Sequence, residues 1–180
     1  HEFSTIPNLK EDTIEFLLNV KGIRLKAHSG RPGKLILEVA RKGEIRASDI
    51  QETEDFEIVN PDLYLATLDE AEPGLYVEMN VECGEGYRQA ENDAGAAVGI
   101  IPVDAVFTPV VKVNFRIEAA RVGRWTNFDK IVFEIWTDGT VKPGEVLRRG
   151  AKILSSFFKQ VYEPVFEKEK TSSLEEKKDN

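Results

Sequence analysis

The stretch from Pro143 to Tyr162 constrains the fold most, because it predicts one helix with more apolar surface than a single neighbour needs. Pro143 suits the first helical position, and Glu145 suits the positive end of the helix dipole. Regular apolar spacing continues to Tyr162, and Pro164 predicts the end of the helix. The large apolar residues come in adjacent pairs: Val146 and Leu147, Ile153 and Leu154, Phe157 and Phe158, Val161 and Tyr162.

These pairs form a surface wider than the stripe of about 100° with which a surface helix covers its own sheet. Each large side chain contributes roughly 1.5–3 kcal/mol when it is fully buried. Leaving several of them in water would cost as much as the whole net stability of a small domain. A second surface should therefore cover this helix. The pattern leaves two sources open, other parts of the same domain or a second subunit.

The residues before this helix predict strands and one early helix. That helix is expected from about Leu9 to Val20, with Asn8 and Glu11 as a capping box and Gly22 at its end. The clearest strand is the stretch from Leu75 to Cys83, where every second residue is apolar and one face is therefore buried. Further strands are predicted at 23–26, 34–40, 56–59, 64–68, 111–119 and 130–136.

The order of these elements predicts an α+β fold in which most strands are antiparallel. Pro109 marks a plausible boundary, because mostly strands precede it and two strands and the long helix follow it. Residues 84–99 and 120–129 are expected to be loops. Residues 164–180 mix acidic and basic side chains with almost no apolar ones, which predicts a flexible tail or the start of a linker. The first residue, His1, suggests a fragment whose N-terminus lies upstream.

Composition limits the possible partners. The net charge of −8 argues against a surface that binds nucleic acid or anionic lipid throughout, so a contact with DNA would have to come through partners. Cys83 is the single cysteine, which excludes an internal disulfide, and its place in the strand pattern predicts a buried thiol. The longest apolar runs fall short of the roughly 20 residues that a membrane helix needs, so no membrane partner is expected.

The sequence predicts no catalytic residue, no metal ligand and no cofactor. Glu134 and Asp138 flank a tryptophan, and a small independent β-rich enzyme that uses them is the alternative interpretation. The strand pattern places Glu134 on the face opposite the expected buried set. Asp138 and Gly139 form a strong turn signal, so Asp138 is expected to shape a turn. The buried set of this strand is expected to be Ile131, Phe133 and Ile135.

Several stretches together resemble one known family. They are "HEFSTIPNLKEDTIEFLLNVKG", "GYRQAEND", "IIPVDAVFTPVVKVNF" and "EAARVGRWTNFDKIVFEIWTDGTVKPGEVLRRGAKIL". In this order and spacing they resemble the amino-terminal region of the alpha subunit of DNA-directed RNA polymerase, of the bacterial type that plastids share. The resemblance covers nearly the whole chain up to about Val161, and the set is specific although no single piece is.

The resemblance implies a fold and a role. Residues 1–109 would be a mostly β insert domain with one early helix, and residues 110–163 the later half of a dimerisation domain that ends in a long interface helix. The role would be that of a non-catalytic assembly subunit, which forms a homodimer and scaffolds the beta and beta-prime subunits for transcription. The compartment would be the bacterial cytoplasm, or the plastid stroma for a plastid-encoded chain.

The resemblance also implies contact residues, each with a structural alternative. Glu15 would face the beta subunit, and Lys21, Val103, Val110 and Lys130 would face beta-prime. Lys21 could equally be a charge at a helix C-terminus, the two valines could be core residues, and Lys130 could be an edge lysine that blocks aggregation. The resemblance implies a dimer interface made of Leu147, Ala151, Leu154, Phe158 and Val161.

The sequence departs from the family pattern in several places. The family's upstream strand and first helix, which supply the other half of the dimer interface, are expected to be missing, as is its DNA-binding C-terminal domain. Arg124 and Trp125 replace the usual Gln-Arg pair, Asn127 replaces an aspartate, and Val111 replaces a basic residue. Because of these changes, the resemblance does not carry over the details of the contacts with the large subunits.

Overall fold

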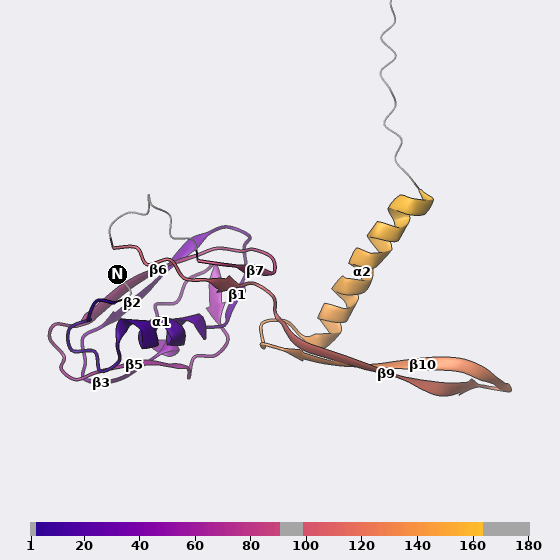
Figure 1. Ribbon diagram of the computed structural model, residues 1–180, viewed down its shortest axis with the longest axis horizontal. Helices are drawn as coiled ribbons and strands as arrows, with labels where there is room; N and C mark the ends of the chain where they lie inside the picture. Colours follow the sequence, from indigo (N-terminus) through magenta and orange to yellow (C-terminus); the bar gives the residue numbers. More distant parts are fainter. Residues whose placement is uncertain (1–2, 91–98, 164–180) are drawn as a thin grey trace, which may run out of the picture. The chain divides into compact units, whose positions relative to one another are not determined.

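A computed structural model of the chain describes residues 3–90 and 99–163 (Figure 1). Its helices and antiparallel strand pairs confirm the predicted α+β class. The chain divides into two compact units, His1–Pro143 and Gly144–Asn180. The predicted boundary at Pro109 stays a prediction, and the predicted tail at 164–180 lies outside the described residues.

The helices and strands follow one another in a fixed order along the chain. They are α1 Thr13–Lys21, β1 Leu25–Ala27, β2 Gly33–Val39, β3 Gly43–Arg46, the 3₁₀ helix η1 Ala47–Asp49, β4 Phe56–Ile58, β5 Tyr64–Leu68, β6 Leu75–Val81, β7 Tyr87–Arg88, β8 Ala105–Val106, β9 Val110–Val122, β10 Trp125–Thr137 and α2 Pro143–Tyr162. The described strands pair as β1 with β4, β2 with β6, β3 with β5, β7 with β8 and β9 with β10.

Helix α1 begins later than the sequence predicts. Its N-cap is Asp12, whose carboxylate accepts a hydrogen bond from the backbone N–H of Glu15 at 2.7 Å. The predicted capping box is wrong, because Asn8 has a positive φ of 62° and its amide donates to the carbonyl of Glu72. Gly22 follows the last helical residue, as predicted.

The alternation from Leu75 is confirmed up to Val81, where β6 ends. Its inward residues pair with β2, with Leu37 opposite Val77. The prediction of a buried Cys83 is wrong: the thiol is exposed, because the strand that would turn it inward stops two residues earlier. An alternating sequence alone does not show where pairing ends.

The buried core lies in the first unit. Its fully buried large side chains come from β2, β3 and β5, and helix α1 adds Phe16. They are Leu35, Leu37, Ile45, Leu65 and Leu68. Strand β3 was not predicted, because "GEIR" holds one apolar residue and gives no alternation to read.

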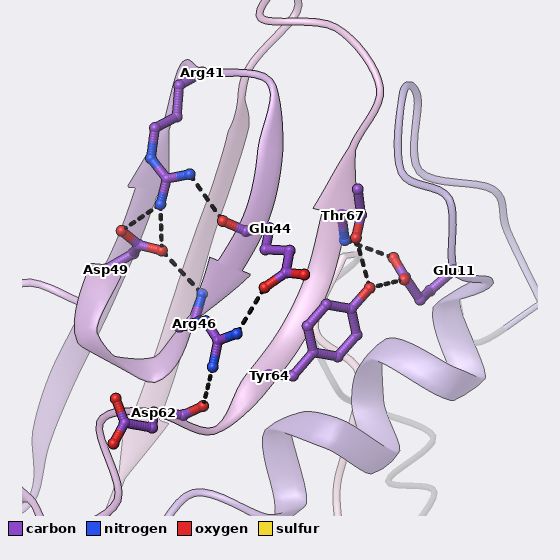
Figure 2. A network of polar contacts seen from close by, with 8 residues as sticks. All are labelled: Glu11, Arg41, Glu44, Arg46, Asp49, Asp62, Tyr64 and Thr67. Atoms are coloured by element: carbon purple, nitrogen blue, oxygen red, sulfur yellow. Dashed lines mark hydrogen bonds and ion pairs between the residues drawn. The ribbon is translucent and has the colours of Figure 1, made fainter.

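A polar network fastens α1 and η1 to this core (Figure 2). The carboxylate of Glu11 accepts hydrogen bonds from the Tyr64 hydroxyl and from the backbone N–H of Thr67, the second at 2.8 Å. Near η1, one nitrogen of the Arg41 guanidinium, Nη2, contacts both carboxylate oxygens of Asp49 at 2.7 and 2.8 Å, and Nη1 donates to the carbonyl of Glu44 at 2.8 Å. Arg41 thus connects the segment before β3 to η1.

Strands β9 and β10 form one long hairpin (Figure 1). The loop predicted at 120–129 is wrong, because β9 continues to Val122 and β10 starts at Trp125. Between them Gly123 has a φ of 61°, and glycine at the first central position is the placement that type II′ hairpin turns favour. The loop predicted at 84–99 is wrong at Tyr87 and Arg88, which form β7, and its residues 91–98 lie outside the described residues.

The register gives this hairpin one apolar and one charged face. On the apolar face the pairs are Val113 with Ile135, Phe115 with Phe133, and Ile117 with Ile131. The buried set predicted for β10 is wrong in this respect, since Ile131 and Phe133 are exposed and Ile135 is only half-buried. In the described part of the chain β9 and β10 pair with each other alone, so no further strand extends their sheet.

Helix α2 has the bounds that the sequence predicts, Pro143 to Tyr162. It contains no buried residue. Within the described ranges, no helix is long and apolar enough to cross a membrane.

Candidate interaction surfaces

Helix α1 presents Glu15 on its exposed side. Phe16 points into the core and fixes the orientation of the helix, which leaves Ile14 and Leu18 also exposed. The side chains of Ile14 and Leu18 are one turn apart, so they form a small apolar strip beside the carboxylate. The structure therefore places the first predicted contact residue where another protein could reach it.

Lys21, at the end of α1, is joined to the segment before β8. Its ammonium lies 2.6 Å from a carboxylate oxygen of Asp104, although the two residues are 83 apart in the sequence. The Tyr87 hydroxyl donates to the same carboxylate at 3.2 Å. The hydrogen bond from Lys21 lowers the pKa of Asp104, and the Tyr87 bond acts in the same direction.

This ion pair brings two predicted contact residues together. Val103 is adjacent to Asp104 in the chain and is exposed, so Lys21 and Val103 lie in one neighbourhood. Sequence reasoning missed Asp104 and Tyr87, because no local pattern shows that they meet the end of a distant helix.

Val110 and Lys130 lie on the hairpin. Val110 is half-buried and pairs with Thr137, while Lys130 is exposed and pairs with Glu118 across the strands. The Lys130 ammonium bonds the Glu118 carboxylate at 3.0 Å. Among the described residues no hydrogen bond or ion pair joins Lys130 to Lys21 or to Glu15.

The charged face of the hairpin is a ladder of ion pairs. Arg116 contacts Glu118 at 2.8 Å and Glu134 at 3.4 Å. The hydrogen bonds from Arg116 and then from Lys130 lower the pKa of Glu118. The four side chains of these pairs are 40–61% exposed, so water screens the charges and each pair contributes little to stability.

Glu134 and Asp138 do not form a catalytic pair. Glu134 is held by Asn114 at 2.9 Å and by Arg116, and Asp138 accepts hydrogen bonds from the backbone and hydroxyl of Thr140 at 3.0 and 2.6 Å. The turn role predicted for Asp138 is confirmed. Each carboxylate is thus used by its own neighbours, and the enzyme alternative is not supported.

Helix α2 exposes the five side chains predicted for the dimer interface. They recur at intervals of four and three residues, which places them on one side of a helix. The exposed fractions of the four large ones run from 44% at Leu147 to 79% at Val161. This stripe consists of Leu147, Ala151, Leu154, Phe158 and Val161, and we call it the α2 stripe.

The chain is similar to one known protein family and to curated proteins that share one name. The family described as the RNA polymerase Rpb3/RpoA insert domain matches residues 1–108, which is more than half of the chain. The DNA-directed RNA polymerase subunit alpha of Herpetosiphon aurantiacus is 51% identical over 157 residues, which cover 87% of this chain and 47% of the relative.

Two further relatives agree. The protein of the same name from Dehalococcoides mccartyi is 49% identical over 158 residues, covering 88% of this chain and 48% of the relative. That from Roseiflexus sp. is 47% identical over 157 residues, covering 87% and 49%. The chain spans about half the length of these relatives. The resemblance stated from its motifs is thereby confirmed, and the chain belongs to the RNA polymerase Rpb3/RpoA insert domain family.

Proposed function

We propose that this chain is part of a non-catalytic assembly subunit of a DNA-directed RNA polymerase. The subunit dimerises through the α2 stripe and presents other surfaces to the beta and beta-prime subunits. The observation that carries the proposal is the exposed α2 stripe, together with the shared name of relatives that are about half identical to the chain. The bacterial origin of those relatives makes the bacterial cytoplasm the proposed compartment.

The exposure of the α2 stripe supports a symmetric dimer. Phe158 and Val161 are 66% and 79% exposed, and apolar patches of this kind mark interaction sites in proteins that remain in solution. In a two-fold dimer the same patch occurs on both partners, so one helix can supply both halves of a contact. The small Ala151, between Leu147 and Leu154 in the stripe, would let two such helices approach closely.

The contacts with the large subunits are proposed on the first unit. Glu15 faces the beta subunit, and Lys21, Val103, Val110 and Lys130 face beta-prime. The paired charges support this assignment, because Asp104 and Glu118 hold Lys21 and Lys130 in place before a partner arrives. Residues 1–109 act as the insert domain and residues 110–163 as part of the dimerisation domain. Any contact with DNA is indirect.

Placing a charge in the α2 stripe tests dimerisation. In the full-length subunit, we expect Leu154→Arg to raise the dimer dissociation constant about tenfold, because a guanidinium must lose water to enter an apolar contact. Light scattering over a series of concentrations measures the mass. The matched control is Ser156→Arg, which places the same group about 200° around the helix. Equal dissociation constants for the two variants would refute the α2 stripe as the interface.

Binding of the large subunits tests the rest of the proposal. The unsubstituted full-length subunit is co-expressed with beta and beta-prime, and the complexes are separated by size. We expect one complex that contains a dimer of this subunit and both large subunits. Recovery of a dimer without either large subunit would refute the assembly role.

A further inference from the structure

Strand β6 has one edge that no other strand pairs with in the described part of the chain, and we call it the open edge. Strand β6 pairs with β2 along all seven of its residues. The second edge of β2 is occupied, because the N–H of Gln51 donates to the carbonyl of Ile36 at 2.8 Å. The second edge of β5 is likewise occupied, by residues 8–10. Strand β6 therefore borders the core with its outer side unpaired.

The register shows which backbone groups face the open edge. The carbonyl of Ile36 points away from β6, because it accepts the bond from Gln51. In an antiparallel pair, two residues directly opposite each other either bond each other or both point their N–H and C=O groups outward. The residue opposite Ile36 is Glu78. The backbone groups of Glu78, and by alternation those of Tyr76 and Asn80, therefore point away from β2.

The inward side chains of β6 are only half covered. Leu35 and Leu37 of β2 are 2% and 0% exposed, whereas their partners across the strands, Met79 and Val77, are half-buried. Val81, the last inward residue of β6, is also half-buried. An added strand would place its own apolar side chains over this row, and removing the row from water is favourable.

An open hollow lies at one end of the β2–β6 pair. Gly33 is opposite Val81 there, so only one of the two paired residues has a side chain. The volume of the hollow is about 410 Å³. Where a bound segment adds to a sheet edge, backbone bonds provide affinity and side-chain pockets of this kind provide specificity. The hollow is lined by Pro32, Gly33, Lys34, Asn80, Val81 and Glu82.

The surroundings of the open edge are acidic. Residues 51–85 contain eleven Asp and Glu residues and no Lys or Arg. On the outward face of β6, Glu78 is 46% exposed and its ion-pair partner is Lys34 of β2. Opposite charges across two strands stabilise their pairing, whereas like charges directly opposite each other destabilise it. A strand that pairs with β6 should therefore carry a basic residue opposite Glu78.

We propose that the open edge of β6 binds an extended segment of another protein in which apolar residues alternate with Lys or Arg. The segment adds as a strand and bonds the free backbone groups of Tyr76, Glu78 and Asn80. Its apolar side chains cover Val77 and Met79, and its basic side chains lie on the outward face. The inference goes beyond the proposed function and does not depend on it.

Two other occupants fit this edge less well. A second copy of β6 would bring its own Glu78 to an acidic edge, which is a like-charge contact. Residues 164–180 of the chain itself contain no run in which apolar and basic residues alternate. Charge complementarity therefore favours a basic segment from a different protein.

Binding of a synthetic peptide to the full-length subunit tests the proposal. The probe is a capped, fluorescein-labelled peptide of eight residues in which valine and lysine alternate, and fluorescence anisotropy measures its dissociation constant. We expect it to bind about tenfold or more tightly than a peptide with the same residues in two blocks, because only alternation places all valines on one face. A peptide that alternates valine with glutamate should bind about tenfold or more weakly than the probe.

Methylation of the peptide backbone tests strand addition directly. Side chains directly opposite each other share a face, so the lysines of the bound probe lie opposite Tyr76, Glu78 and Asn80. The N–H groups of these lysines then point to β6, and those of the valines point away. N-methylation of the lysines should therefore weaken binding about tenfold or more, while N-methylation of the valines should leave it within about threefold.

A charge variant tests the site on the protein. Glu78→Lys should weaken binding of the valine–lysine probe about tenfold and strengthen binding of the valine–glutamate peptide. The matched control is Glu57→Lys in β4, because Glu57 is 52% exposed and also pairs with a lysine across the strands, Lys26. This control should leave both constants within about twofold. Circular dichroism melting should show that both variants fold, since both side chains are exposed.

Three results would overturn the proposal. The first is no binding of the probe at concentrations up to about 1 mM. The second is equal binding of the two N-methylated peptides or of the alternating and block peptides, because charge attraction alone would then explain the affinity. The third is a species larger than a dimer that the probe dissociates, since a second copy of the chain would then occupy the open edge.

Discussion

Substituting Leu37 by alanine is expected to lower the free energy of unfolding by about 3–5 kcal/mol. Leu37 lies in β2 with none of its surface exposed, opposite Val77 of β6, and it also forms a bridge to Ile50 beyond η1. Three separate segments therefore meet at this side chain, and none can move in to fill the space alone. The loss includes both the transfer of the leucine from water and the cavity left behind.

Urea unfolding followed by circular dichroism measures this change. The matched control is Leu18→Ala in α1, where 60% of the side chain is exposed. The same deletion there should change the free energy by about 0.5 kcal/mol or less. A loss at Leu37 no larger than that at Leu18 would mean that the core described around β2 is wrong.

The elements that the sequence predicted well are those with a long, uninterrupted pattern. Helix α2 has twenty residues of regular spacing, a proline at its start and a proline beyond its end, and its bounds are confirmed. The alternation from Leu75 to Val81 is equally regular. For both elements the local pattern agrees with the observed structure. Contacts with distant residues are therefore not needed to explain which element forms.

The start of α1 shows where local reasoning fails. Asn8 and Glu11 match a capping box, but Glu11 is used by β5 through Tyr64 and Thr67. A residue whose carboxylate is bonded to a strand more than fifty positions away cannot also cap a helix. Asp12 then takes the cap position. Here tertiary contacts override the local capping pattern of Asn8 and Glu11, and the sequence contains no pattern that predicts those contacts.

The candidate contact residues were predicted from a resemblance to a family. The residues that hold them in place, such as Asp104, are brought to them by long-range contacts in the fold. Lys21 and Asp104 are 83 residues apart in the sequence and meet only in the folded chain, where Tyr87 of β7 bonds the same carboxylate. The β-bulge of β10 between Trp125 and Phe128 likewise lies within the segment 120–129 that the sequence predicts as a loop. The sequence could therefore suggest which residues matter but not how the fold arranges them.

Substituting Glu11 by glutamine is expected to lower the free energy of unfolding by about 2–3 kcal/mol at pH 7. Glu11 is 9% exposed, and its two carboxylate oxygens accept from the Tyr64 hydroxyl and the Thr67 backbone N–H (Figure 2). A glutamine of the same size keeps one oxygen as acceptor and its N–H₂ group can only donate, so the hydrogen bonds that Tyr64 and Thr67 make to a charged carboxylate are replaced by weaker neutral ones. Glu15→Gln is the control, because the same change on the exposed side of α1 removes no buried partner.

The cost of Glu11→Gln should depend on pH in a predictable direction. Burial raises the pKa of Glu11, but the hydrogen bonds from Tyr64 and Thr67 outweigh it and hold the pKa below its ordinary value of 4.5. A carboxyl whose pKa is lower in the folded than in the unfolded state stabilises the folded chain. This contribution is complete at a pH above the unfolded-state pKa, and it is lost as the pH falls through the folded-state pKa. The other carboxylates are present in both proteins, so their effects cancel in the difference.

Urea unfolding of the unsubstituted chain and Glu11→Gln at several pH values isolates this contribution. We expect the difference in free energy of unfolding to be constant from pH 7 to about 5 and to shrink below pH 4.5. A difference that stays the same in acid would show that the charge of Glu11 contributes nothing and that its size alone matters. A difference that grows in acid would reverse the sign of the pKa shift, and the pair with Tyr64 would then hold a protonated carboxyl.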